Sequence, residues 1–138
     1  MNKVKIWKIY IAGLQMNRTH LMGILNVTPD SFFDGGVNRR PSRAIAAGKA
    51  MWAGGASIID IGGESTRPGA VPVSRNQELA RILPPITGLA RDKVLISVDT
   101  RHATVMKRAA AAGAAAAAAF ALAASSLATW VCSGEGSG

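Results

Sequence analysis

Residues 21–27 have the sequence LMGILNV, and this short apolar run sets the pattern for most of the chain. A run of that length followed by a Gly-rich polar loop predicts a buried strand. Two similar runs, SIIDI at 57–61 and VLISV at 94–98, follow at nearly equal intervals. The spacing is typical of repeated βαβ units, and runs that are apolar on both faces are typical of a buried parallel sheet. We therefore predict an α/β fold with three parallel strands in these positions.

Helix signals lie between the predicted strands. Ser42 can cap a helix that stops at Gly54-Gly55, and Ser74 begins a second helix with a capping-box pattern. Pro84-Pro85 are expected to interrupt this second helix. A third helix is predicted over residues 103–112. The alternation of strand and helix supports the βαβ interpretation.

Two α/β architectures compete. A Rossmann fold requires a G-x-G-x-x-G motif directly after its first strand. This chain has NVTPD at residues 26–30 instead. A (β/α)8 barrel fits better, and in such barrels the chemistry lies at the carboxyl ends of the strands.

Unusual polar residues follow each predicted strand. Asn26 follows the first, Glu64, Thr66 and Arg67 follow the second, and Asp99 follows the third. Each also has a structural explanation: Asn26 can shape a turn, Asp99 can cap the third helix, and Arg67 can be a solvated loop residue. Their coincidence at one rim of a predicted barrel favours a functional site.

Composition excludes several classes of protein. The 138 residues include 16 basic and 8 acidic ones, giving a net charge of +8. This charge suggests anionic partners, but the basic residues are scattered and no nucleic-acid-binding motif accompanies them, so no nucleic-acid partner is expected. A single cysteine, Cys132, excludes an intrachain disulfide framework. Residues 1–11 alternate lysine with apolar residues, which predicts a strand rather than an export signal. We expect a cytoplasmic protein.

The chain changes character after Arg108. Residues 109–124 contain 13 alanines, and residues 109–132 carry no charge. Three interpretations are open for this tail: a membrane span, a soluble helix, or a segment foreign to the domain before it. We expect no membrane association, because large apolar residues are few.

Three segments resemble a known family. MGILNVTPDSFFDGG at 22–36, GASIIDIGGESTRPGA at 55–70 and ISVDTRHATVMKRAAAAGA at 96–114 look like signature segments of dihydropteroate synthase. The family is a (β/α)8 barrel of folate biosynthesis and the target of sulfonamide drugs. It condenses 6-hydroxymethyl-7,8-dihydropterin diphosphate with 4-aminobenzoate and releases diphosphate. The resemblance therefore implies these two small-molecule substrates, and a homodimer for full-length members.

The resemblance also implies roles for particular residues. Asn26 would be the ligand of Mg²⁺ at the diphosphate, and Asp99 would pair with the donor edge of the pterin. Four loop residues complete the implied site: Thr66 and Arg67 at the diphosphate, Phe32 as an aromatic wall of the aminobenzoate pocket, and Asp34 as a negative charge that stabilises a cationic pterin methylene. Asp34 and Arg67 would be the catalytic members of the set.

Departures from the family pattern lie in the second half of the chain. A whole barrel needs about 250 residues, so residues 21–114 are expected to form an N-terminal half barrel, after an extension over 1–20 and before an atypical alanine-rich tail over 115–138. Ala118 and Ala119 stand where the family carries an Asn-Asp pair. Because the match ends where the alanine tract begins, we favour a foreign tail.

Loss of half a barrel has energetic consequences. Open strand edges predict an unstable or self-associating fragment with little activity, and turnover by the purified chain would contradict this. Two alternatives to a truncated synthase remain: a non-catalytic half barrel that self-associates, and a pterin-binding methyltransferase domain.

Overall fold

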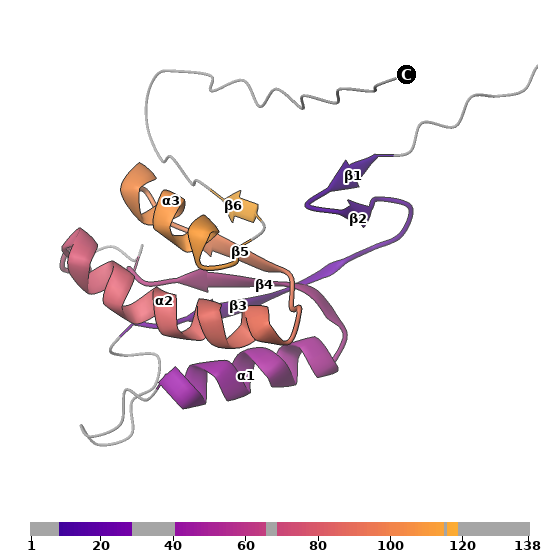
Figure 1. Cartoon of the computed structure of the whole chain (residues 1–138), viewed down its shortest axis with the longest axis horizontal. Coiled ribbons are helices and arrows are strands. Elements are labelled where there is room, and N and C mark those ends of the chain that lie inside the picture. The colour runs from indigo at the N-terminus through magenta and orange to yellow at the C-terminus, as the bar shows by residue number, and fades with distance from the viewer. Residues whose placement is uncertain (1–8, 29–40, 66–68, 115, 119–138) are drawn as a thin grey trace, which may run out of the picture.

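A computed structural model describes residues 9–28, 41–65, 69–114 and 116–118 (Figure 1). Among these residues no helix is both long and apolar enough to cross a membrane. Most of the uncharged segment 109–132, for which a membrane span was one interpretation, lies outside the described part of the chain.

Four strands form one parallel sheet. They are β3 (Leu21–Asn26), β4 (Ala56–Gly62), β5 (Ile96–Asp99) and β6 (Ala116–Ala118). Their order in the sheet is the order of the chain, β3-β4-β5-β6, and each neighbouring pair is parallel. The three predicted strands are therefore confirmed, with ends that differ from the prediction by one or two residues. The sheet continues through β6 into the alanine-rich segment.

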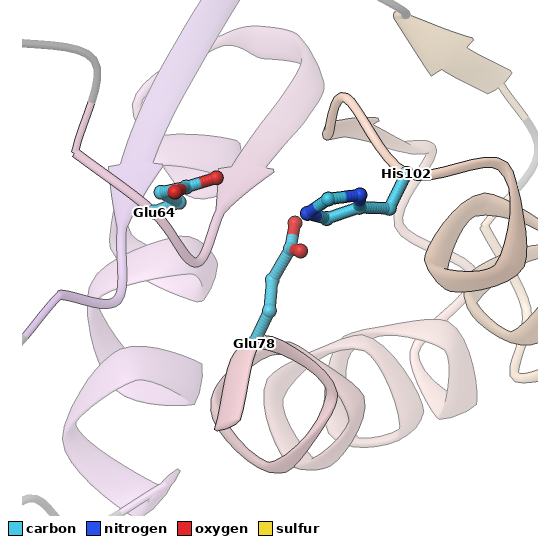
Figure 2. Close-up of side chains that lie close together, drawn as sticks. All are labelled: Glu64, Glu78 and His102. Atoms are coloured by element: carbon cyan, nitrogen blue, oxygen red, sulfur yellow. The ribbon is translucent and has the colours of Figure 1, made fainter. Parts of the chain in front are cut away.

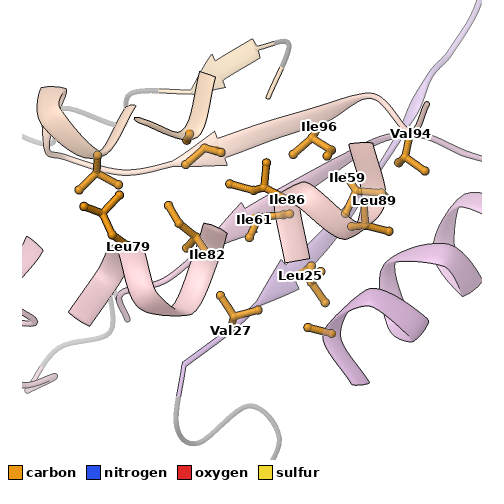
Figure 3. Packing of buried hydrophobic residues seen from close by; sticks show 14 residues of the cluster. Leu25, Val27, Ile59, Ile61, Leu79, Ile82, Ile86, Leu89, Val94 and Ile96 are labelled. Carbon is orange, nitrogen blue, oxygen red and sulfur yellow. The ribbon is translucent and has the colours of Figure 1, made fainter. Parts of the chain in front are cut away.

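Three helices cover one face of the sheet. They are α1 (Pro41–Ala53), α2 (Arg75–Arg91) and α3 (Ala103–Ala111). Figure 1 shows them side by side along the strands, and α2 contacts both of its neighbours. The core lies between sheet and helices, where Ile59, Ile61 and Ile96 meet Ile82, Ile86 and Leu89 (Figure 3). Burial of these aliphatic side chains is the main driving force for this arrangement.

Helix α2 does not stop at its two prolines, contrary to the sequence prediction. It runs continuously through Pro84 and Pro85 to Arg91. Each proline removes one helical hydrogen bond, which would normally break the helix. Ile86 and Leu89, which follow the prolines, are fully buried against the sheet. Continuing the helix keeps these side chains in the core, and we attribute the difference to this tertiary burial.

The opposite face of β3 is uncovered. Met22 and Ile24 are 49% and 54% exposed, whereas Leu25, which points to the helices, is buried. The prediction of strands buried on both faces is therefore wrong for β3. The cause is that all three helices pack on one side of the sheet, so only alternate residues of β3 reach the core.

A small hairpin precedes the sheet. Strands β1 (Tyr10–Ile11) and β2 (Leu14–Gln15) pair in antiparallel fashion. His20 joins this hairpin to the sheet, because Nε2 donates to the carbonyl oxygen of Gln15 and Nδ1 pairs with Ser57 Oγ, both at 3.0 Å. Most of the strand predicted over residues 1–11 lies outside the described residues.

Candidate functional site

Two predicted site residues meet at the carboxyl ends of the strands. Asn26 ends β3 and Asp99 ends β5, and both are in register with Gly62 at the end of β4. A Cβ atom placed on Gly62 would lie 3.5 Å from Asn26 Oδ1 and 3.9 Å from Asp99 Oδ2. The two side chains therefore face the space above Gly62, which has no side chain to fill it. This juxtaposition of amide and carboxylate oxygens is called the Asn26–Asp99 pair below.

A second polar pair lies on the same face of the sheet, two residues nearer the amino ends of β4 and β5. Asp60 on β4 is in register with Ser97 on β5, and both side chains are buried. Ser97 Oγ donates a short hydrogen bond of 2.5 Å to Asp60 Oδ1. Burial raises the pKa of Asp99 above its ordinary value, and the nearby charge of Asp60 raises this pKa further. The carboxylate at the rim is therefore less acidic than a solvated one.

Glu64 anchors the loop that follows β4. Its Oε1 accepts a hydrogen bond of 2.7 Å from Arg101 Nη2 and one of 3.2 Å from the backbone N–H of Val73. Arg81 on α2 donates to the carbonyl oxygen of Gly63 at 2.9 Å. These bonds tie the loop to α2 and to the segment after β5. They fix the position of Glu64 at the start of that loop.

The amino-terminal end of α2 carries a buried acid. Ser74 and Gln77 form the predicted capping box, since Ser74 Oγ accepts from the N–H of Gln77 and Gln77 Oε1 accepts from the N–H of Ser74. Glu78, the next residue, is 0% exposed, and neither carboxylate oxygen has a hydrogen-bond partner among the described residues. Figure 2 shows its carboxylate beside the ring of His102, which precedes α3. One donor atom each of Glu64, Glu78 and His102 lie within 4.8 Å of one another.

The structure tests only part of the predicted site. Phe32, Asp34, Thr66 and Arg67 all lie outside the described residues. Asp99 does not cap the third helix, which was one structural explanation of that residue. The N-cap is His102, whose side chain makes no capping hydrogen bond, because Asp99 still belongs to β5. Asp99 is thereby left facing the space above Gly62.

Sequence reasoning missed two buried acids, Asp60 and Glu78, although both carried a signal. Asp60 interrupts the apolar run SIIDI, and a carboxylate in a buried strand is unusual. Glu78 precedes Ile82 and Ile86 at intervals of four, so it occupies a core-facing position of α2. An acidic residue at a core position of either element marks a polar site inside the fold.

The Asn26–Asp99 pair has a definite chemical capacity. An amide oxygen and a carboxylate at the carboxyl ends of parallel strands can together accept hydrogen bonds from a ligand and contribute oxygen ligands to a hard cation. The carboxyl edge of a parallel sheet is also where ligands bind in α/β proteins.

Comparisons with known proteins show the family of the chain. The model of the family described as pterin binding enzyme matches residues 22–117. The dihydropteroate synthase of Escherichia coli strain K12 is 47% identical over 109 residues, which are 77% of this chain and 39% of that protein. The dihydropteroate synthase of Bacillus subtilis strain 168 is 52% identical over 97 residues, covering 70% of this chain and 34% of that protein.

Solved structures give the same result. The structure of Xanthomonas albilineans dihydropteroate synthase with 4-aminobenzoic acid superimposes with a TM-score of 0.72 and 47% identity, covering 77% of this chain and 40% of that one. A Yersinia pestis dihydropteroate synthase solved as a sulfonamide drug complex has a TM-score of 0.67 and 47% identity, covering 78% and 40% of the two chains. The chain thus spans about two fifths of the length of the relatives it matches.

Proposed function

Because the chain belongs to the family of pterin-binding enzymes, we propose that it is the N-terminal part of a dihydropteroate synthase and supplies half of a (β/α)8 barrel. The reaction is the condensation of 6-hydroxymethyl-7,8-dihydropterin diphosphate with 4-aminobenzoate in the cytoplasm. The observation that carries the proposal is the Asn26–Asp99 pair, set over Gly62 at the carboxyl ends of β3 and β5. The described strands also follow one another in chain order with helices on one face, as successive strands of such a barrel do.

Asp99 binds the pterin in this proposal. Its carboxylate accepts two parallel N–H bonds from the flat heterocycle and so fixes the orientation of the ring. The buried Asp60–Ser97 pair lies on the same face, two residues before Asp99 and its register partner Gly62. The hydrogen bond between Asp60 and Ser97 fixes the side chains below Asp99. A carboxylate that is already held in position lowers the entropy cost of orienting the substrate.

Asn26 holds Mg²⁺ in this proposal. Its side chain is exposed at the end of β3, and Mg²⁺ prefers oxygen ligands while retaining substrate phosphates and water in its shell. A single amide oxygen beside a substrate diphosphate fits that preference, and the Asp99 carboxylate on the same face adds favourable charge. When bound, the ion neutralises charge on the departing diphosphate.

The remaining roles are assigned to loop residues from the resemblance to the family. Thr66 and Arg67 contact the diphosphate, and the planar guanidinium of Arg67 suits its oxygens. Phe32 forms a wall of the aminobenzoate pocket, and Asp34 stabilises positive charge on the pterin methylene before the amine attacks. The position of Glu64 supports this assignment, because its bond to the N–H of Val73 joins the two ends of the second loop and its bond to Arg101 ties that loop to the segment after β5.

A second candidate function follows from the uncovered face of β3. Met22 and Ile24 expose apolar side chains on the side of the sheet that would face the interior of a closed barrel. A non-catalytic half barrel would cover these side chains by self-association. A size that increases with protein concentration, together with a lack of pterin binding, would favour this candidate over the first.

Weak pterin binding by the chain itself tests the proposal. Saturation-transfer NMR on 6-hydroxymethyl-7,8-dihydropterin diphosphate, with Mg²⁺ present, detects binding even at low affinity. We expect transfer for the wild type and at least about a tenfold loss of affinity for Asp99→Asn, since a hydrogen bond to a charged group is worth about 1.5–3 kcal/mol. Asp92→Asn is the matched control, because Asp92 pairs with Lys49 on the surface. Equal transfer in Asp99→Asn and wild type would refute the assignment of Asp99.

A further inference from the structure

The cluster of Glu64, Glu78 and His102 is not used in the proposed reaction. Its three side chains come from the loop after β4, from the first turn of α2 and from the residue before α3. Figure 2 shows them converging from these separate segments. None of them belongs to the Asn26–Asp99 pair.

The state of Glu78 indicates a missing partner. This residue is 0% exposed, and within the part of the chain that the structure describes neither of its carboxylate oxygens has a hydrogen-bond partner. Burying an unpaired carboxylate is strongly unfavourable, so a buried acid is normally paired, protonated or bound to a cation. Among the described His, Cys, Asp and Glu side chains, Glu64 and His102 are grouped with it, one donor atom of each lying within 4.8 Å of the others. A second carboxylate does not relieve the cost, whereas a cation held by all three groups does.

The donor set selects the kind of cation. We infer that Glu64, Glu78 and His102 form a binding site for a divalent first-row transition metal ion of the Zn²⁺ type. Two carboxylates and one imidazole suit Zn²⁺ or Mn²⁺, whereas Mg²⁺ prefers a shell made only of oxygen atoms. Three protein ligands leave a fourth position for water in a tetrahedral shell.

The geometry is within reach of such a shell. Metal–ligand bonds of about 2.0 Å place tetrahedral ligand atoms about 3.3 Å apart, and the three donor atoms already lie within 4.8 Å of one another. Small rotations of Glu64 and His102, which are only partly buried, close the difference.

The neighbouring charges are compatible with cation binding. Arg101 bonds to Glu64 through Oε1 alone and neutralises one of the two acidic charges. The carboxylate of Glu78 is left for a cation to balance. The bound ion would link three segments that are distant in the sequence, and would therefore stabilise the fold.

Metal titration of the chain tests this inference. The background carries Cys132→Ser, which removes the one thiol as a competing ligand. ZnCl₂ is added to chelator-treated protein while thermal unfolding and binding heat are recorded. We expect a stoichiometry of one ion and a melting temperature higher by roughly 10 °C at one hundred times the dissociation constant. The same concentration of MgCl₂ should produce no comparable shift.

Three variants locate the ion. Glu78→Gln and His102→Ala should abolish the zinc-induced shift, and Glu78→Gln should also melt at a higher temperature than the metal-free parent because it removes a buried charge. His20→Ala is the control, since His20 is bound to Gln15 and Ser57 elsewhere, and it should keep the full shift. The inference is overturned if zinc does not bind, if Glu78→Gln or His102→Ala respond like the parent, or if MgCl₂ stabilises as well as ZnCl₂.

Discussion

Close packing of α1 against α2 gives a sharp quantitative prediction. Gly48 lies in the middle of α1, and a Cβ atom placed on it would lie 2.7 Å from Leu89 Cδ1 and 3.1 Å from Leu89 Cδ2. Leu89 is fully buried on α2 and has little freedom to move away. Gly48→Ala should therefore cost about 1–3 kcal/mol from overpacking, offset by about 1 kcal/mol of gained helix propensity.

The sign of this effect should reverse when Leu89 is truncated. Leu89→Ala alone should cost about 2–5 kcal/mol because it leaves a cavity in the core. In that background the methyl group of Gly48→Ala enters empty space, so the substitution should stabilise by about 1 kcal/mol or more from propensity alone. The double-mutant cycle should give a coupling energy of about 1–3 kcal/mol.

Urea unfolding followed by circular dichroism at the helix band measures all four proteins of the cycle. Ala46→Gly is the control, because Ala46 is exposed on α1 and reports helix propensity without touching Leu89. It should lose about 1 kcal/mol in both backgrounds. If Gly48→Ala has the same effect with and without Leu89, within about 0.5 kcal/mol, the packing argument is wrong.

Three further predictions concern polar groups. The raised pKa of Asp99 means that the folded state binds the carboxyl proton more tightly than the unfolded chain does. The contribution of Asp99 to stability therefore falls as the pH rises from the ordinary pKa of 3.8 through the raised one. Asp99→Asn should flatten that part of a plot of urea midpoint against pH, and it should raise the free energy of unfolding at neutral pH. Ser97→Ala removes the hydroxyl that donates to buried Asp60 and should cost about 1–3 kcal/mol, whereas an unchanged unfolding midpoint would show that Asp60 finds another donor. Ser74→Ala removes the N-cap of α2 and should cost about 1 kcal/mol; Ser74→Asp should recover most of that loss, and failure to recover it would contradict the capping role.

The parallel sheet could be predicted from the sequence because each strand is marked by a local sequence pattern. Each is a short apolar run, the first two are closed by Gly-rich loops, and each is found where it was predicted. Asn26 and Asp99 could be placed together for the same reason, since residues after parallel strands share one edge of the sheet. The resemblance to dihydropteroate synthase, carried by the segments around these residues, is confirmed by the family match over residues 22–117.

The errors come from effects that depend on tertiary contacts. Pro84 and Pro85 are local helix breakers, yet burial of Ile86 and Leu89 keeps α2 continuous. The exposed face of β3 depends on which side the helices pack, and the apolar run at 21–27 carries no signal for that choice. The roles of Phe32, Asp34, Thr66 and Arg67 remain predictions by resemblance.

A chimera tests whether this chain can supply the N-terminal part of a working dihydropteroate synthase. The part of the Escherichia coli dihydropteroate synthase that matches this chain is replaced by residues 9–114 of this protein, and formation of 7,8-dihydropteroate is measured with both substrates and Mg²⁺. We expect an active chimera in which Asp99→Asn lowers kcat/KM at least about tenfold, while Asp92→Asn leaves it unchanged. A chimera that folds like the parent enzyme but forms no product, or forms it equally well with Asp99→Asn, would contradict the account.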